Sequence, residues 1–78
     1  MRITHFSTAD LALATTVSIW FPLQQVDKKN PRRALFTFER SKELDELVDK
    51  YWKRELQVEP RQYFDQLKSL KARLYSNE

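Results

Sequence analysis

Apolar and polar residues alternate along the chain in patterns that predict six elements of secondary structure. Arg2 to Phe6 alternates loosely, which indicates a short strand. Ser7 is suited to cap a helix, with Asp10 three residues later in the position of a capping-box acid. The alanine-rich apolar stretch that follows predicts a helix over residues 8–18. The opening therefore predicts a strand and then a helix.

The middle of the chain predicts a hairpin. A bulky run over residues 20–26 indicates a strand, and Pro22 within it indicates a sheet edge, because proline has no N–H to donate. Residues 27–31 are short and polar and end in proline, which is typical of a turn. Residues 33–39 form the clearest strand, since aromatic residues occupy alternate positions and share one face.

Two amphipathic helices are predicted to follow. Ser41 is suited to cap the first of them, and apolar residues then recur at helical spacing. Residues 55–59 form a connector, and Pro60 suits the first turn of a last helix that extends to about Tyr75. The prediction is an α+β fold in the order βαββαα. The hairpin and the short N-terminal strand form a small antiparallel sheet, and three helices pack on one of its faces.

Length and composition narrow the possible functions. The 78 residues predict a single domain over residues 1–78. There is no Cys and one His, His5, which excludes thiolate and histidine-rich metal sites. There is no Gly, which excludes the glycine-rich loops that bind nucleotide phosphates. We therefore expect no cofactor, no metal and no small-molecule substrate.

The chain is also predicted not to be an enzyme. His5 has neither a Cys partner nor a second His with which to build a catalytic pair. The acids that open the second amphipathic helix alternate with apolar residues, so they are expected to face solvent and to favour the helix N-terminus. These acids are Glu43, Asp45, Glu46 and Asp49.

A cytoplasmic location without membrane attachment is expected. No apolar run reaches the roughly 20 residues that a membrane span needs, and the longest candidate, residues 11–23, is interrupted by polar residues and Pro22. The start of the chain lacks the charged, apolar and small-residue regions of a signal peptide.

Core and cap residues along nearly the whole chain carry a family resemblance. They are Phe6-Ser7-Thr8-Ala9-Asp10-Leu11-Ala12-Leu13-Ala14, the strand Arg33 to Glu39 with Ser41 after it, Leu47-Val48, Tyr51-Trp52, Val58, Tyr63-Phe64, Leu67-Lys68, Leu70-Lys71 and Leu74-Tyr75. Together they resemble a family of small bacterial and mobile-element proteins described as a domain of unknown function. The resemblance implies one compact fold and no particular activity.

Positive charge is concentrated in two segments of a chain whose net charge is +3. Residues 28–40 carry five bases and one acid, and bases in the last helix lie among aromatic residues. Both patterns are typical of nucleic-acid binding. They are also typical of a charged hairpin tip that prevents aggregation and of lysines flanking a buried helix face. The predicted nucleic-acid-binding residues are Lys28, Lys29, Arg32, Arg33, Lys68 and Lys71, with Trp20 and Tyr75 as stacking rings.

Neighbouring rings suggest a second function. The pairs Trp20-Phe21 and Tyr51-Trp52 cannot all face one small core, so some of these rings are expected at the surface, where they favour protein contacts. The predicted interface residues are Trp20, Trp52 and Leu56. The leading hypothesis is a non-catalytic module that binds single-stranded or structured DNA or RNA. The alternative is a protein–protein interaction or homodimerisation module.

Overall fold

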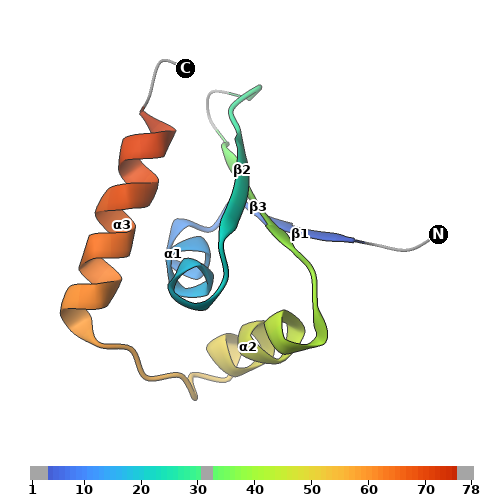
Figure 1. Ribbon diagram of the computed structural model, residues 1–78, viewed down its shortest axis with the longest axis vertical. Coiled ribbons are helices and arrows are strands. Elements are labelled where there is room, and N and C mark those ends of the chain that lie inside the picture. Colours follow the sequence, from blue (N-terminus) through green and yellow to red (C-terminus); the bar gives the residue numbers. More distant parts are fainter. Residues whose placement is uncertain (1–3, 31–32, 76–78) are drawn as a thin grey trace.

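The computed structural model describes residues 4–30 and 33–75 (Figure 1). Within these residues the elements are β1 (His5–Thr8), α1 (Leu11–Trp20), β2 (Leu23–Asp27), β3 (Leu35–Glu39), α2 (Lys42–Trp52) and α3 (Pro60–Leu74). The predicted α+β class and the order βαββαα are confirmed. Arg2 and Ile3 of the predicted first strand lie outside the described residues, as do Pro31 and Arg32 of the predicted hairpin.

The sheet is antiparallel, with β3 between β1 and β2. Phe36 and Phe38 of β3 are 2% and 0% exposed, and the residues of β1 and β2 that pair with them share their face. β2 is an edge strand, as Pro22 predicts, and its pairing with β3 shifts register between Leu23 and Gln25. The alternation in β3 therefore directs its two phenylalanines into the core.

α1 covers the sheet, α3 packs against the outer side of α1, and α2 lies at one end of α1 (Figure 1). Residues 13–17 of α1 are buried on every side, which suits a helix covered from both directions. Thr15 and Thr16 are among them, and their hydroxyls donate to the carbonyls of Leu11 and Ala12 at 2.7 and 2.9 Å. The core thus includes two threonines without an unsatisfied hydroxyl.

The start of α1 differs from the prediction. Asp10, and not Ser7, caps the helix, since its Oδ1 accepts a hydrogen bond from the Leu13 N–H at 3.1 Å. Ser7 belongs to β1, where its hydroxyl lies 3.0 Å from that of Thr37 in β3. Pairing with β3 extends the strand through Thr8 and moves the helix start to Leu11. A long-range contact has overridden a local capping signal.

The end of α1 also differs. The predicted strand began at Trp20, but Trp20 is the last residue of α1, which passes the predicted end at residue 18. Phe21 has φ −129° and ψ 140°, because the proline after it excludes the helical conformation. β2 consequently begins at Leu23, after Pro22 and not before it.

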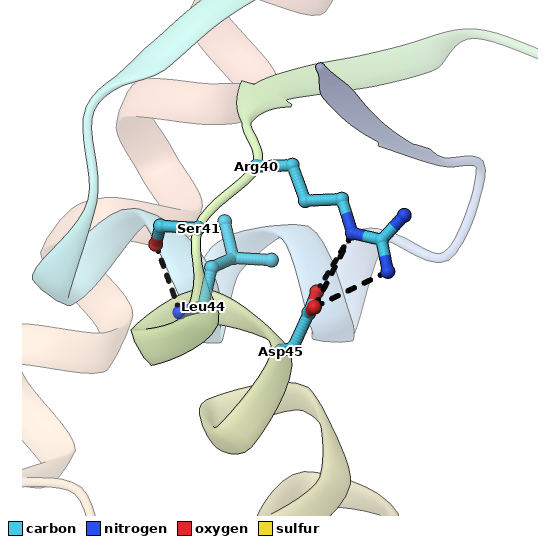
Figure 2. A network of polar contacts seen from close by, with 4 residues as sticks. All are labelled: Arg40, Ser41, Leu44 and Asp45. Atoms are coloured by element: carbon cyan, nitrogen blue, oxygen red, sulfur yellow. Dashed lines mark hydrogen bonds and ion pairs between the residues drawn. The ribbon is translucent and has the colours of Figure 1, made fainter. Parts of the chain in front are cut away.

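The start of α2 follows the prediction (Figure 2). The Ser41 hydroxyl accepts a hydrogen bond from the Leu44 N–H at 3.1 Å, and Leu44 is fully buried. Just before the cap, the Arg40 guanidinium pairs with the Asp45 carboxylate through Nε–Oδ1 at 3.1 Å and Nη2–Oδ2 at 3.2 Å. These contacts orient α2 directly after β3.

The end of α2 has a left-handed residue in a chain without glycine. Arg54 has φ 60°, a conformation that favours glycine. Its N–H donates to the Tyr51 carbonyl at 3.1 Å, and the Glu55 N–H donates to the Lys50 carbonyl at 3.0 Å. This pair of bonds defines a Schellman cap, which turns the chain into the connector before α3.

Candidate nucleic-acid interface

The β2–β3 connection meets the last turn of α3. The Lys28 ammonium donates a hydrogen bond to the backbone carbonyl of Arg73 at 3.2 Å. Within the connection, Asp27 Oδ1 accepts from the Lys29 N–H at 3.0 Å, and the Asn30 carbonyl accepts from the Arg33 N–H at 3.0 Å. The short polar residues predicted for this turn therefore hold its basic residues beside α3.

The sequence around α3 sets which of its sides is exposed. Glu59 caps the helix by accepting from the N–H groups of Arg61 and Gln62 at 3.1 and 2.9 Å, and Pro60 occupies the first turn as predicted. Leu70 is 2% exposed and belongs to the same core as α1. The side of α3 away from α1 is left to solvent (Figure 1).

Aromatic and basic residues follow one another along this exposed side. Phe64, Lys68, Lys71 and Tyr75 are separated by four, three and four residues, which aligns them on one side of a helix. All four are exposed, with Phe64 at 55% and Tyr75 at 74%. The Lys68 ammonium lies 5.1 Å from the centre of the Phe64 ring, a cation–π contact. We call these four residues the α3 stripe.

A cavity of about 510 Å³ lies where the stripe reaches the hairpin connection. Its apolar lining comes from Leu11, Phe36 and Leu74, and Lys28 and Arg33 are among its polar lining residues. Tyr75, the last residue of the α3 stripe, also lines it. The cavity therefore connects the basic hairpin to the aromatic and basic side of α3.

Most of the predicted nucleic-acid-binding residues are brought together. Lys28, Lys29 and Arg33 lie in the hairpin connection beside α3, and Tyr75 lines the cavity that they border. Lys68 and Lys71 continue from there along the stripe. Arg32 lies outside the described residues.

Trp20 is not part of this surface. It ends α1, whereas Ala9 and Leu11, at the other end of that helix, line the cavity. Ten helical residues span about 15 Å, so Trp20 and the hairpin connection lie at opposite ends of α1. The prediction that Trp20 stacks beside the basic hairpin is not supported by this arrangement.

Two of the three predicted interface residues meet in a different cleft. Trp20 and Leu56 line a cavity of about 310 Å³ together with Leu47 of α2. Lys50 lines it too. Trp52 follows Lys50 by two residues, a rotation of roughly 200° that places it on nearly the opposite side of α2. Trp52 is 62% exposed and makes an edge-to-face contact with Tyr51, their ring centres 5.0 Å apart. The structure thus separates Trp52 from Trp20 and Leu56.

Charge is distributed unequally along the molecule. The hairpin connection and the end of α3 lie at one end in Figure 1, and α2 lies at the other. The acids of α2 are exposed, as the alternation predicts. Asp49 pairs with Lys53 at 2.9 Å, and Asp45 pairs with Arg40. The acidic helix therefore points away from the basic hairpin.

Several residues of the surface were missed by sequence reasoning. Asn30, Ala34 and Leu74 line the cavity, and the carbonyl that Lys28 contacts belongs to Arg73. No local pattern signals these residues, because they belong to segments that meet only in the folded chain. Phe64 had a local signal, since it lies among the lysines of the last helix at helical spacing.

Residues 4–30 and 33–75 contain neither a metal-binding cluster nor a membrane-spanning helix. Among those residues no three His, Cys, Asp or Glu side chains gather closely enough to hold a metal ion. The Nδ1 of His5 lies 2.9 Å from the hydroxyl of its neighbour Thr4. No helix in this part of the chain has the length and apolar character to cross a membrane.

The fold and surface define a small α+β domain with a basic and aromatic side. The sequence pattern of one protein family matches residues 4–76, and the chain belongs to that family, described as Domain of unknown function (DUF5659). The expectation that the chain belongs to an uncharacterised domain family is thereby confirmed. No curated protein and no solved structure matches the chain.

Proposed function

We propose that this domain binds single-stranded or structured nucleic acid, with little sequence preference and without catalysis. The observation that carries the proposal is the contact between Lys28 and Arg73, which joins two basic segments that are 45 residues apart. The contact places bases of both segments on one part of the molecule, where they can meet successive phosphates.

The charge distribution supports the same proposal. Lys28, Lys29 and Arg33 lie at the end of the molecule opposite the acidic α2. Such separation orients an approaching polyanion toward the basic end, which raises the association rate at low ionic strength. A net charge of +3 is modest, so the position of the charges matters more than their sum.

The rings of the α3 stripe add a contact that phosphates alone do not give. Phe64 and Tyr75 are 55% and 74% exposed, and they flank Lys68 and Lys71. Exposed rings beside bases are suited to stack nucleobases of any sequence. This accounts for the low sequence preference in the proposal.

A titration of labelled single-stranded DNA and RNA at about 50 and 200 mM salt tests the proposal. For each phosphate contact removed, the slope of log affinity against log salt should fall by about 0.7. We expect this loss for Lys29→Ala/Arg33→Ala and for Lys68→Ala/Lys71→Ala. The matched control is Lys42→Ala/Lys50→Ala, which removes the same charge from α2.

Equal weakening by the control pair would mean that net charge alone drives binding, against the proposed surface. Absence of binding at the lower salt concentration would reject nucleic-acid binding altogether.

The cleft at Trp20 favours homodimerisation as a second candidate function. Trp20 is 49% exposed and lies beside Leu56 and Leu47 in a partly apolar hollow. A small domain with exposed rings completes its apolar burial by pairing with a second copy. Sedimentation over a hundredfold dilution tests this: we expect Trp20→Ser/Leu56→Ser to shift the chain toward monomer, and a wild-type monomer at every concentration would reject it.

A cytoplasmic location accompanies the main proposal, because nucleic acid is available there. The bacterial or mobile-element origin that the resemblance implies is likewise a prediction. Fractionation of cells that express the tagged chain tests the location, and recovery outside the cytoplasm would contradict it.

A further inference from the structure

The cavity beside Tyr75 has the size and floor of a small-ligand pocket. Its volume of about 510 Å³ falls within the range of roughly 300–1,000 Å³ that is common for such pockets. Phe36 is 2% exposed, and Leu11 and Leu74 are half-buried, so its apolar lining belongs to the packed interior. A flat, weakly polar group fits this lining better than a charged one.

Two small residues contribute to the hollow. Ala9 and Ala34 line the cavity with one-carbon side chains, the first before α1 and the second before β3. Both are half-buried. A larger side chain at Ala34 would extend into the space, which makes this position suitable for blocking the cavity.

The polar lining supplies the complementary chemistry. Lys28 and Arg33 bring cations, and Asn30 brings an amide that both donates and accepts hydrogen bonds. The bond to the Arg73 carbonyl holds the Lys28 ammonium at the cavity, where its positive charge attracts a phosphate. Tyr75 is 74% exposed and presents a ring at the same place.

Resting on the proposed function, we propose that this cavity takes one unstacked nucleobase of a single strand. The base lies on the apolar floor against the Tyr75 ring, and its edge faces the Asn30 amide. The phosphate next to that base contacts Arg33 and Lys28. A base within a duplex is already paired and stacked, so the cavity selects single-stranded segments.

The test compares an oligonucleotide with an abasic strand of the same length and phosphate number. We expect the protein to bind oligothymidine or oligouridine about tenfold more tightly than the matching abasic strand, which corresponds to about 1.4 kcal/mol. Ala34→Leu and Tyr75→Ala should each lower this ratio several-fold, toward the part that stacking on Phe64 supplies, while abasic affinity and its salt dependence stay unchanged. Tyr75→Phe, which keeps the ring, should preserve the ratio.

The outcomes separate this inference from the proposed function. Equal wild-type affinity for the base-bearing and abasic strands overturns the base pocket and leaves phosphate binding in place. A ratio that survives both Ala34→Leu and Tyr75→Ala also overturns it, by assigning the base contact elsewhere. Absence of binding to every strand at low salt overturns both. The comparison of base-bearing and abasic strands on the wild-type protein tests the base pocket even if a variant fails to fold.

Discussion

The Lys28 ammonium lies 3.2 Å from the backbone carbonyl of Arg73, in the last turn of α3. Carbonyls in the last turn of a helix have no partner within the helix, and their partial negative charge favours a cation. One lysine of the hairpin connection therefore both caps α3 and belongs to the proposed binding surface.

Lys28→Ala should loosen the end of α3. We expect faster amide exchange at Tyr75, whose N–H bonds the Lys71 carbonyl at 3.0 Å, and a loss of less than about 1 kcal/mol in the free energy of unfolding. Lys29→Ala removes the neighbouring charge and serves as the control. Equal exchange in the two variants would contradict the capping role.

Ser41 should matter more to stability than the ion pair beside it. Ser41→Ala removes the cap of α2 and should cost about 1 kcal/mol of unfolding free energy. Arg40→Ala should cost less than about 1 kcal/mol, because its pair with Asp45 is 41% and 46% exposed and solvent screens it. Urea unfolding compares the two, and a larger loss for Arg40→Ala would reverse this ranking.

Arg54→Gly should stabilise the protein. Its φ of 60° is strained for a residue with a Cβ and is accessible to glycine, so a gain of about 1 kcal/mol in unfolding free energy is expected. Lys53→Gly is the matched control, because Lys53 has φ −82° and glycine only adds unfolded-state entropy there. Denaturant unfolding should move in opposite directions for the two, and a less stable Arg54→Gly would disprove the strain.

Tyr51 should make stability depend on alkaline pH. Burial raises the pKa of its phenol above the ordinary value of 10.0, and nearby Asp10 and Tyr63 act in the same direction. The folded state thus favours the neutral phenol, whose contribution is complete below about pH 10 and is lost as the pH rises through the raised pKa. Relative to Tyr51→Phe, the wild-type unfolding free energy should fall above about pH 10, and parallel curves would contradict this.

The helices that follow residue 40 could be predicted because their signals are local. Ser41 caps α2 and Pro60 is the first residue of α3, and the spacing of apolar residues determines the buried side of each helix. The ends of α1 were harder to predict. Its start depends on how far β1 pairs with β3, and its end depends on Pro22, whose effect on Phe21 is visible in the sequence.

The candidate surface could be predicted only in parts. Lys28 and Lys71 are each recognisable by their charge, but no local sequence pattern indicates that the hairpin connection reaches the end of α3. The cavity between them requires the same long-range contact. For Trp20 the prediction was wrong in the other direction. An aromatic side chain suggested base stacking, but Trp20 lies at the far end of α1, away from the hairpin.

The covering of α1 from two sides constrains the order in which the chain acquires its structure. α1 is synthesised early, but α3, which covers its outer side, comes last among the described elements. Until α3 leaves the ribosome, the buried run from Leu13 to Val17 lacks one of its covers. Contacts between such distant segments form slowly and leave apolar surface exposed meanwhile. We therefore expect a nascent chain that ends before residue 60 to remain sensitive to protease and to recruit chaperones.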